Sequence, residues 1–152
     1  MKIAIASDHG GFELKEFVKE YLLKKEYEVD DFGCPNKDSV DYPDFGIKAA
    51  RAVADKKADK GIVICTTGIG MSMVANKVRG IRAALCRTPK AAEMSRKHND
   101  ANVLALGGAF VEDKTAVEIL DIWLNTEFEG GRHGRRVDKI TDIERSNNDG
   151  IS

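Results

Sequence analysis

Short apolar runs alternate along the chain with longer segments in which apolar residues recur every three or four positions. Runs such as 2–6 (KIAIA) and 61–65 (GIVIC) have the length of a β-strand. The three-to-four spacing, as in 13–25, is typical of one face of a helix. The pattern predicts strands at 2–6, 28–32, 61–65, 81–86 and 102–106. It predicts helices at 13–25, from 41–43 onward, at 70–77, 90–98 and 115–124, and a more polar one at 132–144.

Strands in alternation with helices predict an α/β fold, in which a parallel sheet is covered by helices on both faces. The run 61–65 is apolar throughout, which suits a parallel strand buried on both sides. The local pattern leaves the strand order open. In a 2-1-3-4-5 order the first and third strands would be neighbours, and a ligand would bind where their carboxyl ends meet.

Length and charge narrow the class of protein. The 152 residues predict one domain, 1–152, since domains average about 150 residues. The 24 Lys and Arg against 25 Asp and Glu lack the basic excess of a nucleic-acid-binding protein. There is neither an apolar run of about 20 residues nor a secretory leader pattern, so we expect a cytoplasmic protein without a membrane span. Cys34, Cys65 and Cys86 form no CxxC pair and indicate free thiols.

Two predicted strands end in loops that are rich in reactive groups. The first strand ends in 7–11 (SDHGG) and the third in 65–72 (CTTGIGMS). If these strands are neighbours, Asp8 and His9 would face Cys65 and Thr67 across one crevice.

The glycines of the second loop are consistent with a ligand-binding loop. Gly68 and Gly70 let the backbone approach a ligand closely, and the following helix adds free N–H groups and the positive end of its dipole. Such a loop favours an anion, which could be a phosphate, an enediolate oxygen or the thiolate of Cys65. The loop matches neither the Walker A nor the dinucleotide-binding fingerprint.

Each of these features also has a purely structural interpretation. Cys65 could be a buried core cysteine, because free cysteines are commonly buried. Asp8 could cap a helical turn. Gly68 and Gly70 could form no more than a tight turn. Cys34 and Cys86 are interpreted as structural.

The position of His98 raises a separate question. It ends a predicted helix that returns to the amino edge of the sheet, opposite to the edge expected for Cys65. His98 therefore either interacts with its own helix dipole or serves the site of a second subunit. The three histidines, His9, His98 and His133, have no histidine partner at i+4, so no metal-binding motif such as HExxH is indicated.

The segment 130–136 (GGRHGRR) carries three arginines. It could be a solvated basic turn, or a clamp for an anion, because guanidinium groups bind phosphate bidentately. A nucleic-acid patch is less favoured, because the rest of the chain is not basic and aromatic residues are not interleaved.

Five stretches together carry a family resemblance. They are SDHGGFELK (7–15), DYPDF (41–45), GIVICTTGIGMSMVANKVRGIRAALC (61–86), SRKHNDANVLALGG (95–108) and EFEGGRHGRRVDKI (127–140). In this order they resemble the ribose-5-phosphate isomerase type B family, which includes the galactose-6-phosphate isomerase subunits. The resemblance implies a Rossmann-like three-layer α/β/α sandwich with a five-stranded parallel sheet. It also implies a homodimer, sometimes paired into a tetramer, and an aldose–ketose isomerisation of a sugar phosphate that needs no metal and no cofactor.

Carried over position by position, the resemblance implies a role for each site residue. Cys65 would move the proton between C1 and C2, Thr67 and the loop amides would stabilise the enediolate, and His98 would open the sugar ring from the other subunit. The residues implied to bind substrate are Asp8, His9, Thr66, Gly68, Ile69, Gly70, Asn99, Arg132 and Arg136. The tail 130–152 would pack at the dimer interface.

Two positions depart from the family pattern. Thr66 stands where many members have glycine, and Ala109 stands where members commonly have a phosphate-binding arginine, for which Arg135 could compensate. The expected substrate is D-ribose 5-phosphate, with D-ribulose 5-phosphate as product. The alternatives are an isomerase of another aldose or of an allose- or galactose-type 6-phosphate, and a non-catalytic sugar-phosphate-binding module. A thiol redox sensor that pairs Cys65 with Cys86 is a further alternative.

Overall fold

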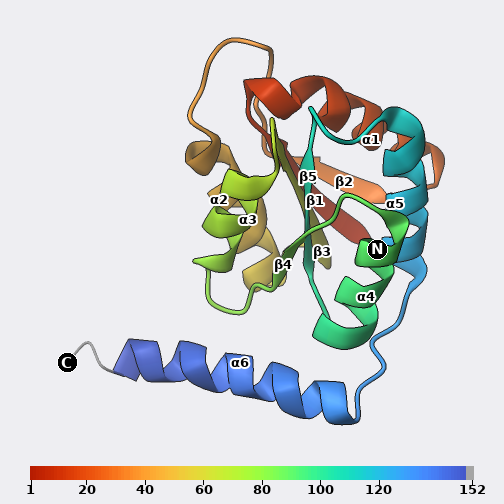
Figure 1. Ribbon diagram of the computed structural model, residues 1–152. Helices are drawn as coiled ribbons and strands as arrows, with labels where there is room; N and C mark the ends of the chain where they lie inside the picture. Colours follow the sequence, from red (N-terminus) through yellow and green to blue (C-terminus); the bar gives the residue numbers. More distant parts are fainter. Residues whose placement is uncertain (150–152) are drawn as a thin grey trace.

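A computed structural model describes residues 1–149, with a five-stranded parallel sheet at its centre (Figure 1). The strands are β1 (Lys2–Ser7), β2 (Glu28–Asp31), β3 (Lys60–Cys65), β4 (Ala83–Leu85) and β5 (Val103–Gly107). The α-helices are α1 (Phe12–Lys24), α2 (Tyr42–Ala54), α3 (Ile69–Asn76), α4 (Pro89–Asn99), α5 (Asp113–Asn125) and α6 (Arg132–Asp149), and a short 3₁₀ turn, η1, spans His9–Gly11. The α/β fold predicted from the sequence is confirmed. Residues 150–152 of the predicted domain lie outside the described part.

The strand order is β2-β1-β3-β5-β4, with every neighbouring pair parallel. β1 and β3 are therefore neighbours, as the crevice hypothesis requires, but the order differs from 2-1-3-4-5 because β5 lies between β3 and β4. Burial explains why β5, and not β4, lies beside β3. Every residue of β5 is buried, which suits a central strand, whereas the three residues of β4 are only partly buried, which suits an edge.

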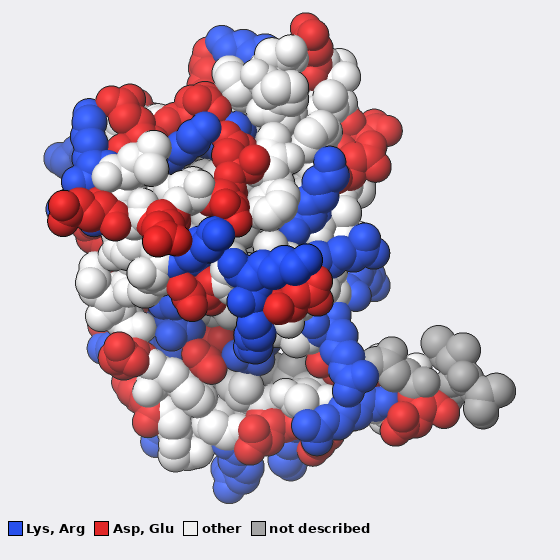
Figure 2. Space-filling model, turned by 180° about the vertical axis from the view of Figure 1, so that it is seen from behind, with Lys and Arg blue, Asp and Glu red and all other residues white. Residues whose placement is uncertain are grey.

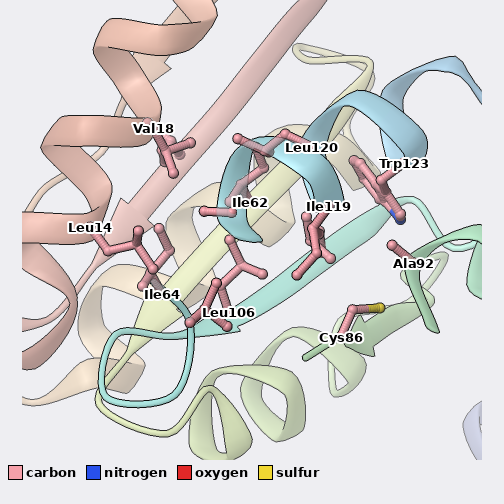
Figure 3. Close-up of a cluster of buried hydrophobic side chains, with 14 of the residues drawn as sticks. Leu14, Val18, Ile62, Ile64, Cys86, Ala92, Leu106, Ile119, Leu120 and Trp123 are labelled. Carbon is pink, nitrogen blue, oxygen red and sulfur yellow. The ribbon is translucent and has the colours of Figure 1, made fainter. Parts of the chain in front are cut away.

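The two faces of the sheet carry side chains of different size. In β1, Ile3 and Ile5 point to one face while Ala4 and Ala6 point to the other, because successive side chains alternate in a strand. The face with large side chains packs against α1, α4 and α5, and Figure 3 shows part of this cluster, including Ile119 and Trp123. The face with small side chains packs against α2 and α3. The KIAIA pattern thus lets the second layer of helices approach the sheet closely.

The last helix, α6, extends away from the layers at the amino edge of the sheet (Figure 1). It is anchored by the buried Val137 and by a hydrogen bond of 2.9 Å from the Gly80 amide to the Glu144 carboxylate. Its Ile140 and Ile143 remain 49% and 62% exposed. Both line a groove of about 620 Å³ between α6 and the body of the chain. The helix predicted in the tail is confirmed, and it leaves an apolar surface only partly covered.

Charged side chains are spread over the surface. Figure 2 shows acidic and basic side chains intermixed on the face seen from behind, so that neither sign forms a continuous surface there. None of the described helices combines the length and the apolar character needed to cross a lipid bilayer.

Lys60, at the start of β3, provides a test of this packing. Its ammonium nitrogen lies 5.1 Å from the centre of the Trp123 ring. Burial, together with the charge of Arg96, lowers the pKa of Lys60 to about 8, although nearby carboxylates oppose the shift. In the unfolded chain the pKa returns to its ordinary value of 10.5. Between these two values the unfolded chain binds more protons than the folded chain, so this group's contribution to the free energy of unfolding rises with pH.

We therefore expect the stability advantage of a Lys60→Met variant to be largest near pH 7 and to shrink above pH 8. Urea unfolding of both proteins at a series of pH values measures this difference. The exposed Lys57, changed to Met, is the control and should show no such trend. A constant difference for Lys60→Met would contradict the lowered pKa.

Candidate functional site

Three loops meet at the carboxyl edge of the sheet, following β1, β3 and β5. The amides of Gly108 and Ala109 donate to the carbonyl oxygens of Cys65 and Thr66, both at 2.9 Å. The first loop is equally close, because a Cβ placed on Gly10 would lie 2.0 Å from the Thr66 hydroxyl oxygen. Thr66 therefore fits beside the loop that follows β1 because residue 10 is glycine. The loop that follows β5 reaches the loop that follows β3 because β5 lies directly beside β3 in the sheet.

Cys65 ends β3 and is 5% exposed. Its sulfur accepts a hydrogen bond of 3.2 Å from the Gly68 amide, which holds the thiol at the start of α3. The Thr67 hydroxyl accepts from the Ile69 amide at 3.2 Å. Cys65 is thus buried, as the structural interpretation requires, and it also faces a loop of amides, as the functional interpretation requires.

The start of α3 offers unpaired backbone donors. Gly68 precedes the helix with a φ of +79° and provides no side-chain cap. The amides of Gly70 and Met71 make no hydrogen bond within residues 1–149. These two N–H groups lie at the positive end of the α3 dipole, close to the Cys65 thiol. The geometry supports the predicted anion site.

Gly68→Ala should damage both the fold and the site. A Cβ at this position would lie 2.6 Å from Leu85 Cδ1 and 2.8 Å from the Leu106 carbonyl carbon, and the positive φ disfavours any L side chain. We expect a loss of about 1–3 kcal/mol in the free energy of unfolding, measured by urea titration. Gly134→Ala is the matched control, because nothing lies within 4 Å of its Cβ, and it should be neutral or slightly stabilising. Equal stability of the two variants would contradict this account of the loop.

Asp8 and His9 line the β1 side of the same edge. The buried Asp8 carboxylate accepts from the Gly11 amide at 3.0 Å, so the capping interpretation of Asp8 is confirmed. Nδ1 of His9 accepts from the Val40 amide at 3.2 Å. In this hydrogen bond Nδ1 has no proton, so in the neutral ring Nε2 carries it. The exposed His9 therefore presents an N–H donor, which suits a phosphate oxygen.

Tyr42 is a residue of the site that the sequence pattern did not indicate. The sequence pattern places it at the start of a helix and in the stretch DYPDF without a site role, yet its ring lies so close to Gly70 that a Cβ there would be 2.6 Å from Tyr42 Cζ. Its side chain is partly exposed beside the free amides of α3. The one sequence signal was Gly70 itself, since a glycine can mark a close approach by another group.

The remaining predicted residues form a second group at the amino edge. His98 and Asn99 end α4, and the imidazole of His98 stacks on that of His133 with ring centres 4.2 Å apart and planes inclined by 11°. Arg132 and Arg136 lie one turn apart at the start of α6, and both are exposed. Since α4 runs back along the sheet, His98 lies at the edge opposite to Cys65 within one chain. The positional argument from the sequence is confirmed, and one chain does not bring the two groups together.

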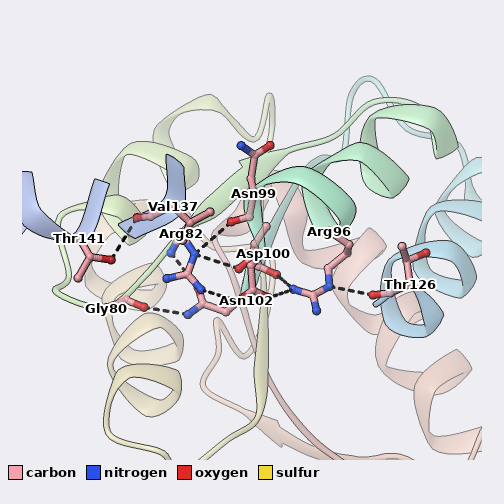
Figure 4. A network of polar contacts seen from close by, with 10 residues as sticks. Gly80, Arg82, Arg96, Asn99, Asp100, Asn102, Thr126, Val137 and Thr141 are labelled. Atoms are coloured by element: carbon pink, nitrogen blue, oxygen red, sulfur yellow. Dashed lines mark hydrogen bonds and ion pairs between the residues drawn. The ribbon is translucent and has the colours of Figure 1, made fainter. Parts of the chain in front are cut away.

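The end of α4 is firmly held (Figure 4). The guanidinium of the buried Arg96 donates to the Asp100 carboxylate at 2.9 Å and to the Thr126 carbonyl at 3.2 Å. Arg82 donates to the other carboxylate oxygen of Asp100 at 3.1 Å. His133 is buried, and this burial, followed in effect by the neighbouring His98, lowers its pKa. The network fixes the position of His98 relative to the sheet.

A disulfide between Cys65 and Cys86 is contradicted by the fold. Cys86 belongs to the large-residue face, as Figure 3 shows, whereas Cys65 belongs to the small-residue face. With β5 between β3 and β4, the two cysteines are also separated by about 9.6 Å across two strand spacings, beyond the ~7 Å limit for a disulfide. Burial raises the pKa of the Cys86 thiol, which lowers its reactivity. The redox-pair alternative is therefore wrong.

Comparison with known proteins places these features in a family. The model of the family described as Ribose/Galactose Isomerase matches residues 3–140. The chain is 46% identical to ribose-5-phosphate isomerase B of Escherichia coli, with 97% of this chain and 99% of that protein covered. It is 49% identical, with the same coverage, to a protein of Bacillus subtilis named only as a sugar phosphate isomerase.

Solved structures give the same result. Ribose-5-phosphate isomerase B of Clostridium thermocellum matches with a TM-score of 0.95 and 56% identity, over 96% of this chain and 99% of that one. The enzyme of Mycoplasma genitalium, solved with bound ribulose 5-phosphate, matches with a TM-score of 0.91 and 46% identity, over 95% and 96% of the two chains.

Proposed function

Because the chain belongs to the ribose/galactose isomerase family, we propose that it interconverts D-ribose 5-phosphate and D-ribulose 5-phosphate through an enediolate. The observation that carries the proposal is the Cys65 sulfur held 3.2 Å from the Gly68 amide, beside the free amides of Gly70 and Met71. A base and a set of anion donors thus lie at one point, as a proton transfer next to a carbonyl requires.

The reaction uses side-chain and backbone groups alone. Once the ring is open, the Cys65 thiolate removes the proton from C2 of the aldose. Thr67 and the loop amides stabilise the negative charge that forms on the enediolate oxygens. The proton then returns to C1, while a hydroxyl proton passes between the two oxygens, so that the aldehyde becomes a ketone. Asp8 and Tyr42 lie where they can orient the sugar hydroxyls.

The acid–base group for ring opening comes from a second copy of the chain. His98 and Asn99 lie at the amino edge, and a twofold dimer would bring them to the Cys65 edge of a partner. The partly exposed Ile140 and Ile143 on α6 support this arrangement, because a second copy would cover them. In the dimer, the described part of the tail segment, 130–149, packs at the interface.

The phosphate group binds to hydrogen-bond donors from both copies. His9 offers its Nε2–H from one chain, and Arg132 and Arg136 of the other offer guanidinium groups. Ala109 supplies no charge, but the guanidinium carbon of Arg87 lies 4.0 Å from the ring centre of Phe110, the next residue. Arg87 has no carboxylate partner within residues 1–149. We assign it to the phosphate site in place of the arginine that position 109 lacks.

Arg87→Ala should raise the KM for ribose 5-phosphate by at least about 10-fold while kcat changes little, because one charged hydrogen bond is worth roughly 1.5–3 kcal/mol. The KM for unphosphorylated ribose, if it is turned over, should not change. Steady-state kinetics of both substrates provide the measurement, and Arg51→Ala, at an exposed position in α2, is the control. An unchanged KM for ribose 5-phosphate would remove Arg87 from the site.

Proton NMR of D-ribose 5-phosphate in D₂O with the purified protein tests the proposed function. We expect ribulose 5-phosphate to form and the C2 proton signal to be lost. If ribose 5-phosphate is inert while an allose- or galactose-type 6-phosphate or a free aldose is converted, the substrate assignment is wrong and the isomerase chemistry stands. Binding without turnover or exchange of any of these sugars would favour the non-catalytic sugar-phosphate-binding module.

A further inference from the structure

The histidine cluster, His98, Glu129 and His133, joins segments that are far apart in the sequence. The ligand atoms of the three side chains all lie within 4.8 Å of one another. Nε2 of His133 is 3.5 Å from a carboxylate oxygen of Glu129. Two imidazoles and one carboxylate are a donor set that zinc uses where a fourth position stays open. We propose that this cluster binds Zn²⁺ or a similar divalent transition-metal ion, which inhibits the enzyme and takes no part in the isomerisation.

The backbone brings the three ligands together. The Glu129 amide donates to the carbonyl of Lys97, at the end of α4, at 3.2 Å. Gly130 and Gly131 follow with φ values of +69° and +55°, a region that favours glycine. These two residues turn the chain so that α6 begins beside α4, and the His133 amide closes the turn on the Gly130 carbonyl at 3.0 Å. Glu129 and His133 are therefore held on the side where His98 ends its helix.

Small side-chain rotations would complete the site. Tetrahedral zinc, with bonds of about 2.0–2.1 Å to nitrogen, places its ligand atoms about 3.3 Å apart. The ligand atoms lie within 4.8 Å of one another, so no separation must shrink by more than about 1.5 Å. His98 is partly exposed and Glu129 is exposed, so both side chains have room to rotate. The stacking of the two rings is exchanged for a shared ion, and water takes the fourth position.

Occupation of this site would withdraw His98 from catalysis. A histidine nitrogen bound to a metal ion has no lone pair with which to accept a proton. This inhibition rests on the proposed function, because it requires His98 to open the sugar ring. The binding of the metal ion does not depend on that function.

Calorimetric titration of the metal-free protein with ZnCl₂ tests the binding. We expect about one ion per chain, and at least about 10-fold weaker binding in Glu129→Gln and His133→Gln, since even loss of a supporting residue costs that much. Glu127→Gln, a neighbouring exposed carboxylate, and Cys65→Ala should bind zinc like the parent. Co²⁺ bound to the parent should show no thiolate charge-transfer absorption. Absence of binding, binding unchanged in Glu129→Gln and His133→Gln, or loss of binding in Cys65→Ala would overturn the proposal.

The kinetic arm separates this proposal from the proposed function. In the isomerase assay, Glu129→Gln should need at least about 10-fold more Zn²⁺ for half inhibition than the parent or Glu127→Gln. Equal sensitivity of Glu129→Gln and the parent would mean that zinc inhibits elsewhere. If the parent isomerises no aldose at all, the proposed function fails, while the calorimetric result still decides whether the cluster binds metal. Circular dichroism of each variant shows that a lost effect does not reflect a lost fold.

Discussion

Cys65→Ala should lose at least about 10²-fold in kcat for ribose 5-phosphate while the chain stays folded, because a positioned base contributes about 10²–10⁴-fold. The side chain is small and packs among alanines, so its truncation leaves little space behind. Exchange of the C2 proton with D₂O should be lost in parallel with turnover, because both need the same base. Stopped-time NMR assays measure the two rates on one sample.

Cys86→Ala is the matched control for this prediction. Cys86 is as buried as Cys65 but lies on the other face of the sheet, and it should keep parental kcat with a modest loss of stability. A Cys65→Ala enzyme that turned over ribose 5-phosphate within 10-fold of the parent, a loss an order of magnitude below the range of about 10²–10⁴-fold expected for general-base loss, would assign the proton transfer to another group.

Mixing two inactive variants should restore activity. In a shared site, Cys65→Ala lacks the base in one chain and His98→Gln lacks the ring-opening group in the other, so each homodimer is inactive. A mixed dimer keeps one site with both groups intact. Random exchange of subunits makes about half of the dimers mixed, which gives about a quarter of the parental activity.

Tagged copies of the two variants, co-expressed and purified through both tags, isolate the mixed dimer for this measurement. Activity per mixed dimer should approach half that of the parent, with one intact site in two. If His98 acted within its own chain, every site in the mixture would lack one group and no activity would return. A protein that remained monomeric in sedimentation would also contradict the shared site.

The local pattern predicts most of the elements well, because the central strands β1, β3 and β5 are short apolar runs and the helices that cover the sheet have an apolar face, whereas the edge strand β2 is largely acidic. It overestimated β4, which spans only Ala83–Leu85. Ile81, expected in this strand, instead closes a turn on the Val78 carbonyl and fills the core below α3. An apolar residue indicates burial, and burial occurs in turns as well as in strands.

The strand order could not be predicted from the local sequence pattern. A helical crossover can place the next strand directly beside the previous one or one position further along the sheet, as it does between β3 and β4. The consequence for the site is the loop 107–110, which the order brings onto Cys65 and Thr66. Tyr42 was missed for the same reason, because its contact with Gly70 joins segments that no sequence pattern relates. The separation of His98 from Cys65 was predictable, because helix direction in a parallel sheet is fixed by the alternation itself.

The strand order also determines how the Cys65 thiol would recover from oxidation. Cys34 follows β2 and Cys86 follows β4, so each follows a strand two positions away from β3 on opposite sides. Peroxide attack on Cys65 would give a sulfenic acid that neither cysteine of its own chain can reach. Within one chain, reduction of this sulfenic acid would then require a small external thiol that enters by the route proposed for the substrate. A bound sugar phosphate would block that route. It would therefore slow oxidation of the Cys65 sulfur by peroxide, and it would also slow reduction of the sulfenic acid once that had formed.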